Sequence, residues 1–251
     1  MEEVISALVA EQAELSGVLS DLGAADWSRP SRCEGWDIVD VVLHLAQTNE
    51  LAVGSAQGQF DAVLERLAGG LGRAGSVDEA VAAMVERERG AAGSEVFARW
   101  SSSASELEAV LCAGDMSERV KWVAGDLSLR TLATTRLAET WIHRGDIADA
   151  VGITLAPTDR LKLIARLAWR TLPYAFSSIG RTWSGPVAFQ LTSPAGTLWE
   201  FRPDEPAVTT ISGPAADLCA VASRRVLPAA TALRGEGPDT DTVLALVRTY
   251  A

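Results

Sequence analysis

The stretch from Thr131 to Gly152 reads TLATTRLAETWIHRGDIADAVG, and the rest of the chain is organised around it. Its apolar residues recur at the spacing of an amphipathic helix. Ser128 can cap the start of this helix, and glycine is favoured just past a helix end, as at position 152. Glu139 and His143 lie one turn apart on it. We therefore expect one long helix that carries an acid–histidine pair on one face.

The bulk properties of the 251-residue chain restrict its function class. With 48 % hydrophobic and 22 % charged residues it has ample material for a core, either in one large domain or in two modest ones. A formal net charge of −11 repels phosphate backbones, so we expect no nucleic-acid partner. No window approaches the roughly 18 apolar residues of a membrane span, and the acidic start is unlike a signal peptide. We expect a cytoplasmic protein without a membrane partner.

The order of the predicted elements indicates an α+β chain that is mainly α. Helical spacing dominates up to about residue 180, and a strand pattern follows at 187–192, with a turn and a returning strand to 201. A third strand is expected at 207–211, and helices at 215–226 and 239–250. We predict a helical bundle over residues 1–183 and a small α+β unit over residues 184–251.

The second histidine of the chain, His44, lies in another helical stretch, VDVVLHLAQTNE. Asp37 can cap this helix, and Asp40 adds favourable charge to its first turn. The helix is expected to run to about residue 68, with Gly54 and Gly58 marking a bend or close packing.

The three cysteines are odd in number and far apart, which argues against a disulfide framework or a Cys-x-x-Cys metal pair. Cys112 and Cys219 are expected to be small core residues, because free cysteine is often buried.

Glu139 and His143 could hold a metal together with His44. At this helical spacing their Cβ atoms lie roughly 5–6 Å apart on one face. Two imidazoles and one carboxylate are a common donor set for catalytic zinc, although iron, nickel and manganese also accept it. The alternative is a helix-stabilising pair and a core histidine. The apolar neighbours of His44 favour the metal, because a buried imidazole needs a partner.

Asp146 lies three residues after His143 and faces roughly the same way. It could orient a metal ligand or contact a substrate. The alternative is an ion pair with Arg144, Arg166 or another cation.

Three segments resemble the family of mycothiol-dependent maleylpyruvate isomerases, which belong to the DinB-like four-helix superfamily. The first lies between Trp27 and Ala46 and ends in GWDIVDVVLHLA, and the second is ETWIHRGDIADAVG from Glu139 to Gly152. The third, GPAADL from Gly213 to Leu218 followed by Arg224-Arg225, resembles the C-terminal unit, which is similar to sterol-carrier domains. The likeness spans nearly the whole chain, in matching order. It is strongest to an actinobacterial subgroup of largely uncharacterised metal-binding proteins.

The resemblance implies an up-down-down-up bundle that holds Zn²⁺ through His44, Glu139 and His143. It also implies that an arginine of the C-terminal unit contributes to the active site. Arg225 is the best positional match, followed by Arg224 and Arg234.

Three hypotheses for function follow. In the first, the metal activates a low-molecular-weight thiol such as mycothiol, which isomerises a small electrophilic substrate or is transferred to it. Arg225 would hold a substrate carboxylate. In the second, the metal polarises a carbonyl without a thiol, as an isomerase, lyase or cyclase of specialised metabolism would need. In the third, the protein binds metal or an apolar ligand without catalysis. A monomer or a homodimer fits each.

Overall fold

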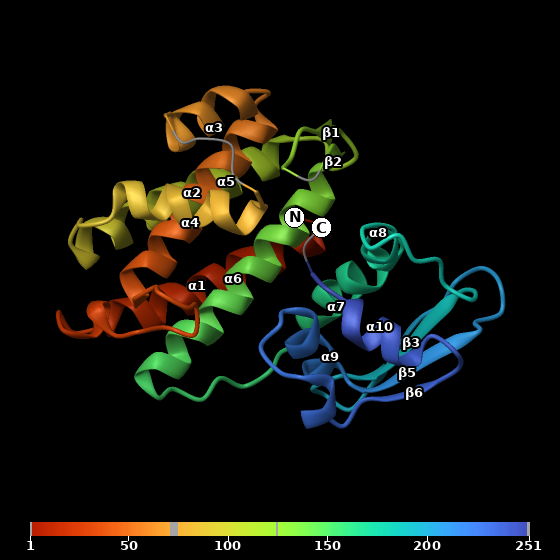
Figure 1. Cartoon of the computed structure of the whole chain (residues 1–251). Helices are drawn as coiled ribbons and strands as arrows, with labels where there is room; N and C mark the ends of the chain where they lie inside the picture. Colours follow the sequence, from red (N-terminus) through yellow and green to blue (C-terminus); the bar gives the residue numbers. More distant parts are fainter. Residues whose placement is uncertain (1, 71–74, 124, 250–251) are drawn as a thin grey trace. The chain divides into compact units, whose positions relative to one another are not determined.

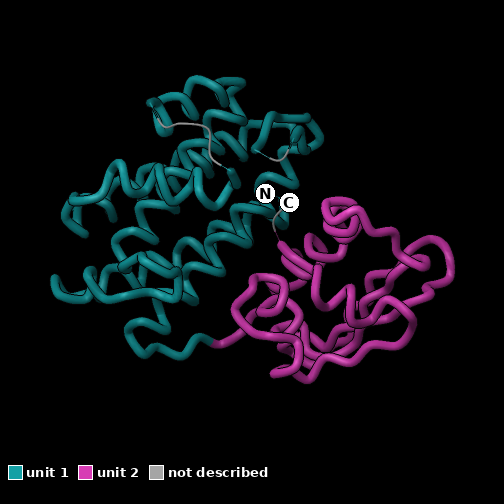
Figure 2. The backbone as a smooth tube through the Cα atoms, in the orientation of Figure 1, with its two compact units in different colours: residues 1–155 teal, residues 156–251 magenta. Residues whose placement is uncertain are grey.

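The structure, a computed structural model, describes residues 2–70, 75–123 and 125–249. It divides into two compact units, Met1–Leu155 and Ala156–Ala251, which Figure 2 colours separately. The predicted division lay later, at 183/184. The two helices in between, α7 (Leu161–Arg170) and α8 (Leu172–Ser177), pack on elements of the second unit. The sequence shows that each of these helices has an apolar face that must be buried, but it does not show which unit buries that face.

The first unit is built from helices (Figure 1). Its four longest helices pack in a ring: α2 on α5, α5 on α1, α1 on α6 and α6 on α2. Within its described residues the unit also contains two short helices, a 3₁₀ turn and a two-stranded antiparallel hairpin. The elements are α1 (Glu3–Ser20), η1 (Asp26–Ser28), α2 (Ile38–Ala56), α3 (Phe60–Ala68), α4 (Val77–Glu88), α5 (Gly93–Ala113), β1 (Arg119–Val120), β2 (Leu127–Ser128) and α6 (Leu129–Val151).

Local sequence signals set the ends of the two helices that matter most here. Helix α2 begins with a capping box in which the Asp37 backbone N–H donates to Asp40 Oδ2 at 3.0 Å. Helix α6 begins at a cap in which Ser128 Oγ accepts from the Thr131 N–H at 3.2 Å. It ends at Gly152, whose φ of 75° is left-handed. These caps were predicted from the sequence, and they fix where the side chains of both helices point.

The predicted single helix from residue 37 to 68 is broken. It stops at Ala56, and α3 resumes at Phe60 after a turn in which Gly58 has a φ of 71°. Close packing at Gly54 is confirmed, because a Cβ there would lie 2.5 Å from Val63 Cγ2. The break folds α3 back against α2.

The core of the first unit lies between α1, α2, α4, α5 and α6. Its members are aliphatic side chains together with one tryptophan: Leu15, Leu19, Ile38, Val41, Val42, Leu45, Val85, Val96, Trp100 and Ile147. Among the described residues, no helix is long and apolar enough to cross a membrane.

The second unit confirms the predicted α+β character. Strands β3 (Val187–Thr192) and β4 (Leu198–Phe201) form the expected antiparallel hairpin, and β5 (Thr209–Pro214) lies parallel to β3. A strand that was not predicted, β6 (Arg234–Glu236), completes the order β4-β3-β5-β6. Three residues are too few to show an alternating pattern. A 3₁₀ turn, η2 (Pro228–Ala230), precedes β6.

The helices of this unit are shorter than predicted. Helix α9 (Ala215–Ala222) stops before Arg224, which has a left-handed φ of 61°. Helix α10 (Thr240–Leu246) ends early too, and its predicted end at residue 250 lies outside the described residues. Of the two predicted core cysteines, Cys219 is buried, but Cys112 is exposed at the end of α5, so that prediction was wrong.

Candidate metal centre

Helices α2 and α6 bring three of the predicted site residues together. His44 comes from α2, and Glu139 and His143 come from α6. One carboxylate oxygen, Glu139 Oε2, lies 3.4 Å from Nε2 of His44 and 3.5 Å from Nε2 of His143. One donor atom from each residue can be chosen so that all three lie within 4.8 Å of one another. The side chains thus converge on a point that one ion can occupy.

The three side chains differ in their access to solvent. Those of His44 and His143 are 8 % and 9 % exposed, whereas Glu139 is 19 % exposed. The ring of Trp36 lies 5.3 Å from the His44 ring, centroid to centroid. Of the three side chains, that of Glu139 is therefore the most accessible to solvent.

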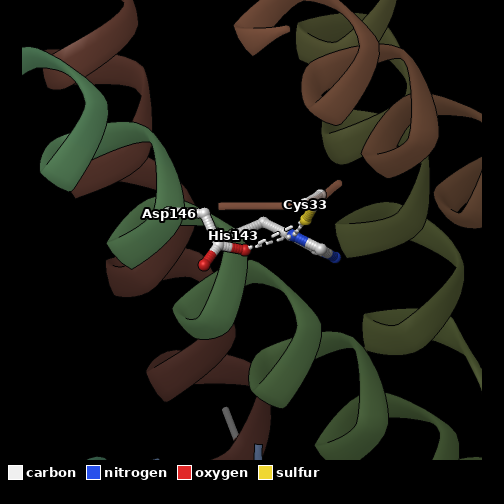
Figure 3. A group of neighbouring side chains, drawn as sticks. All are labelled: Cys33, His143 and Asp146. Carbon is white, nitrogen blue, oxygen red and sulfur yellow. Dashed lines mark hydrogen bonds and ion pairs between the residues drawn. The ribbon is translucent and has the colours of Figure 1, made fainter. Parts of the chain in front are cut away.

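Asp146 lies on the opposite edge of the His143 ring (Figure 3). Its Oδ2 is 2.9 Å from His143 Nδ1, and the residue is 1 % exposed. The thiol of Cys33, in the segment before α2, donates to the same oxygen at 3.4 Å and lies 3.8 Å from Nδ1. Asp146 is thus placed to orient a histidine. Of the cations predicted as alternative partners of Asp146, Arg144 pairs with Glu11.

The contacts define two overlapping candidate sets, both of which include His143. One uses its Nε2 together with His44 and Glu139, and the other uses its Nδ1 together with Cys33 and Asp146. A carboxylate 2.9 Å from Nδ1 fits an N–H···O hydrogen bond, which keeps a proton on Nδ1 and leaves Nε2 as the nitrogen that can bind a metal once it is deprotonated. The first set therefore fits a metal, and the second fits a support that fixes the tautomer.

The electrostatics agree with this division. Burial alone raises the pKa of Glu139, but hydrogen bonds from His143 and His44 hold it well below its usual value. Burial lowers the pKa of His143, and hydrogen bonds to Asp146, Cys33 and Glu139 outweigh it and raise the pKa well above 6.5. Burial is the main cause that lowers the pKa of His44. A neutral His44 and an ionised Glu139 are the forms that ligate a cation.

Sequence reasoning missed two residues near the centre. Arg136 is 5 % exposed and lies one turn before Glu139 on α6, with its guanidinium 5.1 Å from the centre of the Trp122 ring. Arg136 lies three residues before Glu139 and seven before His143, so all three lie on the same face of α6. This spacing could have identified Arg136 as a residue of the site. Cys33 lies in a loop, where no periodicity predicts its contacts.

Each of the predicted arginines of the C-terminal unit donates to a backbone carbonyl of the same unit. Arg225 is half-buried, and its Nη1 donates to the Ser223 carbonyl oxygen at 2.9 Å. Nη1 of Arg224 donates to the carbonyl of Ala245, and Nη1 of Arg234 donates to that of Leu233. Their role in the active site stays a prediction.

Comparisons with known proteins place this geometry in a family. The sequence model described as "Mycothiol maleylpyruvate isomerase N-terminal domain" matches residues 8–148, which include all three convergent side chains and Asp146. Uncharacterised proteins from two strains of Mycobacterium tuberculosis, CDC 1551 and H37Rv, are 28 % identical over 248 residues. The match covers 98 % of this chain and 95 % of theirs.

Two solved structures share the fold. A crystal structure of the mycothiol-dependent maleylpyruvate isomerase has a TM-score of 0.59 at 19 % identity and covers 94 % of both chains. A histidine-to-alanine mutant of that isomerase has a TM-score of 0.60 at 19 % identity, over 90 % of this chain and 89 % of that one. The predicted resemblance and the predicted mainly helical α+β class are both confirmed.

Proposed function

This chain belongs to the family of mycothiol maleylpyruvate isomerase N-terminal domains, and on that basis we propose that it is a metal-dependent enzyme. It activates a low-molecular-weight thiol of the mycothiol kind toward a small electrophilic substrate. The outcome is isomerisation of the substrate or transfer of the thiol to it. The cation is zinc, held by His44, Glu139 and His143.

The observation that carries the proposal is the convergence of these three donors from two helices. A bound divalent cation lowers the pKa of a thiol and so supplies a thiolate at neutral pH. Among the described residues, Cys33 is the cysteine near the centre, and its thiol faces Asp146 and the Nδ1 edge of His143. The reacting thiol is therefore supplied by a cosubstrate.

The supporting residues each have a task in this proposal. Asp146 holds the proton on Nδ1 of His143, so that Nε2 keeps facing Glu139. Trp36 packs against the His44 ring. Arg225 of the C-terminal unit is proposed to hold a substrate carboxylate, a role that suits the planar guanidinium. Replacement of Arg225 by glutamine is expected to lower turnover without changing metal content.

A non-catalytic metal site is the less favoured alternative. Such sites are closed by four protein ligands, whereas catalytic sites keep one position open. Asp146 contacts Nδ1 of His143, whereas Nε2 of that ring faces Glu139. Among the described residues, the group of His44, Glu139 and His143 contains no fourth histidine, cysteine or acid. This supports an open position.

Metal content and turnover test the proposal together. Purified protein should contain about one equivalent of zinc by mass spectrometry, and His44→Ala should lose it. Thr48→Ala is the matched control, because Thr48 is buried one turn further along α2. Full retention of zinc in His44→Ala would contradict the ligand assignment.

Incubation with mycothiol and maleylpyruvate should give an isomer or an adduct. Turnover of an electrophile without any thiol would instead favour direct polarisation of a carbonyl.

A further inference from the structure

Arg136 is a buried cation at the edge of the candidate metal centre. It is 5 % exposed, and its guanidinium packs against the ring of Trp122, with the centroid 5.1 Å away. Trp122 also contacts Phe60, with ring centroids 6.0 Å apart. The aromatic pair gives the guanidinium a fixed platform. Arg136 lies three residues before Glu139 on α6, which places both residues on the same face of that helix.

The hydrogen-bonding capacity of Arg136 is largely unused. Its Nε and Nη1 atoms are buried and have no hydrogen-bond partner in the part of the chain that the structure describes. Arg144, the other buried arginine of α6, shows what a structural arginine looks like here. Its Nε lies 2.7 Å from Glu11 Oε1, and it also pairs with Glu14. Among the residues that the structure describes, carboxylates thus pair with Arg144, and none pairs with Arg136.

A buried guanidinium without a carboxylate partner is costly, because arginine stays charged in proteins. Glu139 is the neighbouring carboxylate, but two imidazoles already share it. When a divalent cation occupies the centre, the cation and Arg136 together outweigh the negative charges of Glu139 and Asp146. The centre then carries an excess of positive charge next to two unused donor nitrogens, Nε and Nη1 of Arg136.

We propose that Arg136 binds the carboxylate of a small molecule that reaches the metal centre, and that it selects carboxylates over uncharged analogues. The inference rests on the proposed function for the metal, and it names the class of ligand that the centre accepts. The guanidinium offers planar N–H pairs that match a carboxylate, and the Trp122 face holds that plane in place. This role is separate from that of Arg225, which lies in the other unit.

Binding of pyruvate and of its uncharged analogue pyruvamide to the zinc-loaded full chain tests the proposal. Calorimetry compares the wild type, Arg136→Met and Arg130→Met. Arg130 is the matched control, because it lies on the same helix but is exposed and pairs with Glu2 at the surface. We expect Arg136→Met to weaken pyruvate binding roughly 10- to 100-fold, with little effect on pyruvamide. Arg130→Met should bind both compounds as the wild type does.

Two further readouts separate this role from a structural one and from failure of the metal site. Loss of an unpaired buried charge should leave the melting temperature of Arg136→Met unchanged or higher, whereas a structural arginine would lower it. Zinc content, measured on the same samples, should not fall in Arg136→Met.

The inference about Arg136 is overturned if Arg136→Met prefers pyruvate over pyruvamide as strongly as the wild type does, with zinc retained in both proteins. A wild type that holds no zinc overturns the proposed function instead. The same comparison, repeated on the metal-free protein, then still decides the role of Arg136.

Discussion

Replacement of Asp146 by asparagine should weaken zinc binding about tenfold without unfolding the protein. Asp146 contacts the His143 ring on the edge away from Glu139, at 2.9 Å from Nδ1. Asparagine has nearly the same shape and keeps one acceptor oxygen. The substitution therefore removes the negative charge behind the imidazole while it preserves the packing of a side chain that is only 1 % exposed.

The expected size follows from the kind of hydrogen bond that changes. A hydrogen bond to a charged group contributes about 1.5–3 kcal/mol, and roughly half of this is lost when the charge is removed. That loss corresponds to about 3- to 13-fold in affinity. Loss of a residue that orients a metal-bound histidine typically costs about 10- to 100-fold. The two ranges meet near tenfold.

Competition with a chromophoric zinc chelator measures the affinity. Asp149→Asn is the control, because it makes the same change on the same helix at an exposed residue that pairs with Arg32. The pKa of His143 in the metal-free protein should also fall in Asp146→Asn, and NMR can follow it because the chain has only two histidines. An affinity within twofold of the wild type, with an unchanged pKa, would refute the orienting role.

Three further predictions test the electrostatics and the packing. Because the pKa of His143 is raised well above 6.5, zinc should displace about one proton from this residue when it binds at neutral pH. Below the pKa of His143, the apparent affinity of the protein for zinc should fall about tenfold for each unit of pH. The number of protons released on zinc binding can be measured by calorimetry in buffers of different ionisation enthalpy. In urea unfolding, Gly54→Ala should destabilise the protein by about 1–3 kcal/mol, because the new Cβ meets Val63. Gly17→Ala is the control: its new Cβ lies in open space on α1, so it should stabilise the protein by about 0.5–1 kcal/mol. Despite burial, hydrogen bonds from two arginines lower the pKa of Glu50 below 4.5. The ion pairs of Glu50 therefore stabilise the fold above pH 4.5, and this stabilisation is lost as the pH falls through the lowered pKa. In Glu50→Gln, the free energy of unfolding should therefore depend less on pH in this acidic range.

The parts of the fold that local chemistry controls were predictable from the sequence. The ends of α6 followed from a serine cap and a glycine, and the start of α2 followed from Asp37 as its cap and the charge of Asp40 in its first turn. The hairpin of β3 and β4 followed from alternation around a turn. The convergence of His44 on Glu139 was a prediction about packing, and it needed the family resemblance to become specific.

The rest depended on contacts that sequence spacing does not encode. Helix α7 has an apolar face, but only the folded chain shows that α9 covers it and moves the boundary to Leu155. Cys33 reaches Asp146 from a loop. A charged residue such as Arg136 is usually solvated, so its burial appears only in the structure.

One face of α6 explains why the site lies where it does. Arg136, Glu139, His143 and Asp146 follow one another at intervals of three, four and three residues, which is the spacing of a helix seam. In a bundle built for stability alone this seam would be apolar, because burial of ionisable groups is costly. Three of the four are buried, and Glu139 is the most accessible. Functional sites are where chains depart from such rules. In the function proposed above, the stripe forms one unit: Asp146 would orient His143, His143 and Glu139 would hold the cation, and Arg136 would select the charge of the ligand.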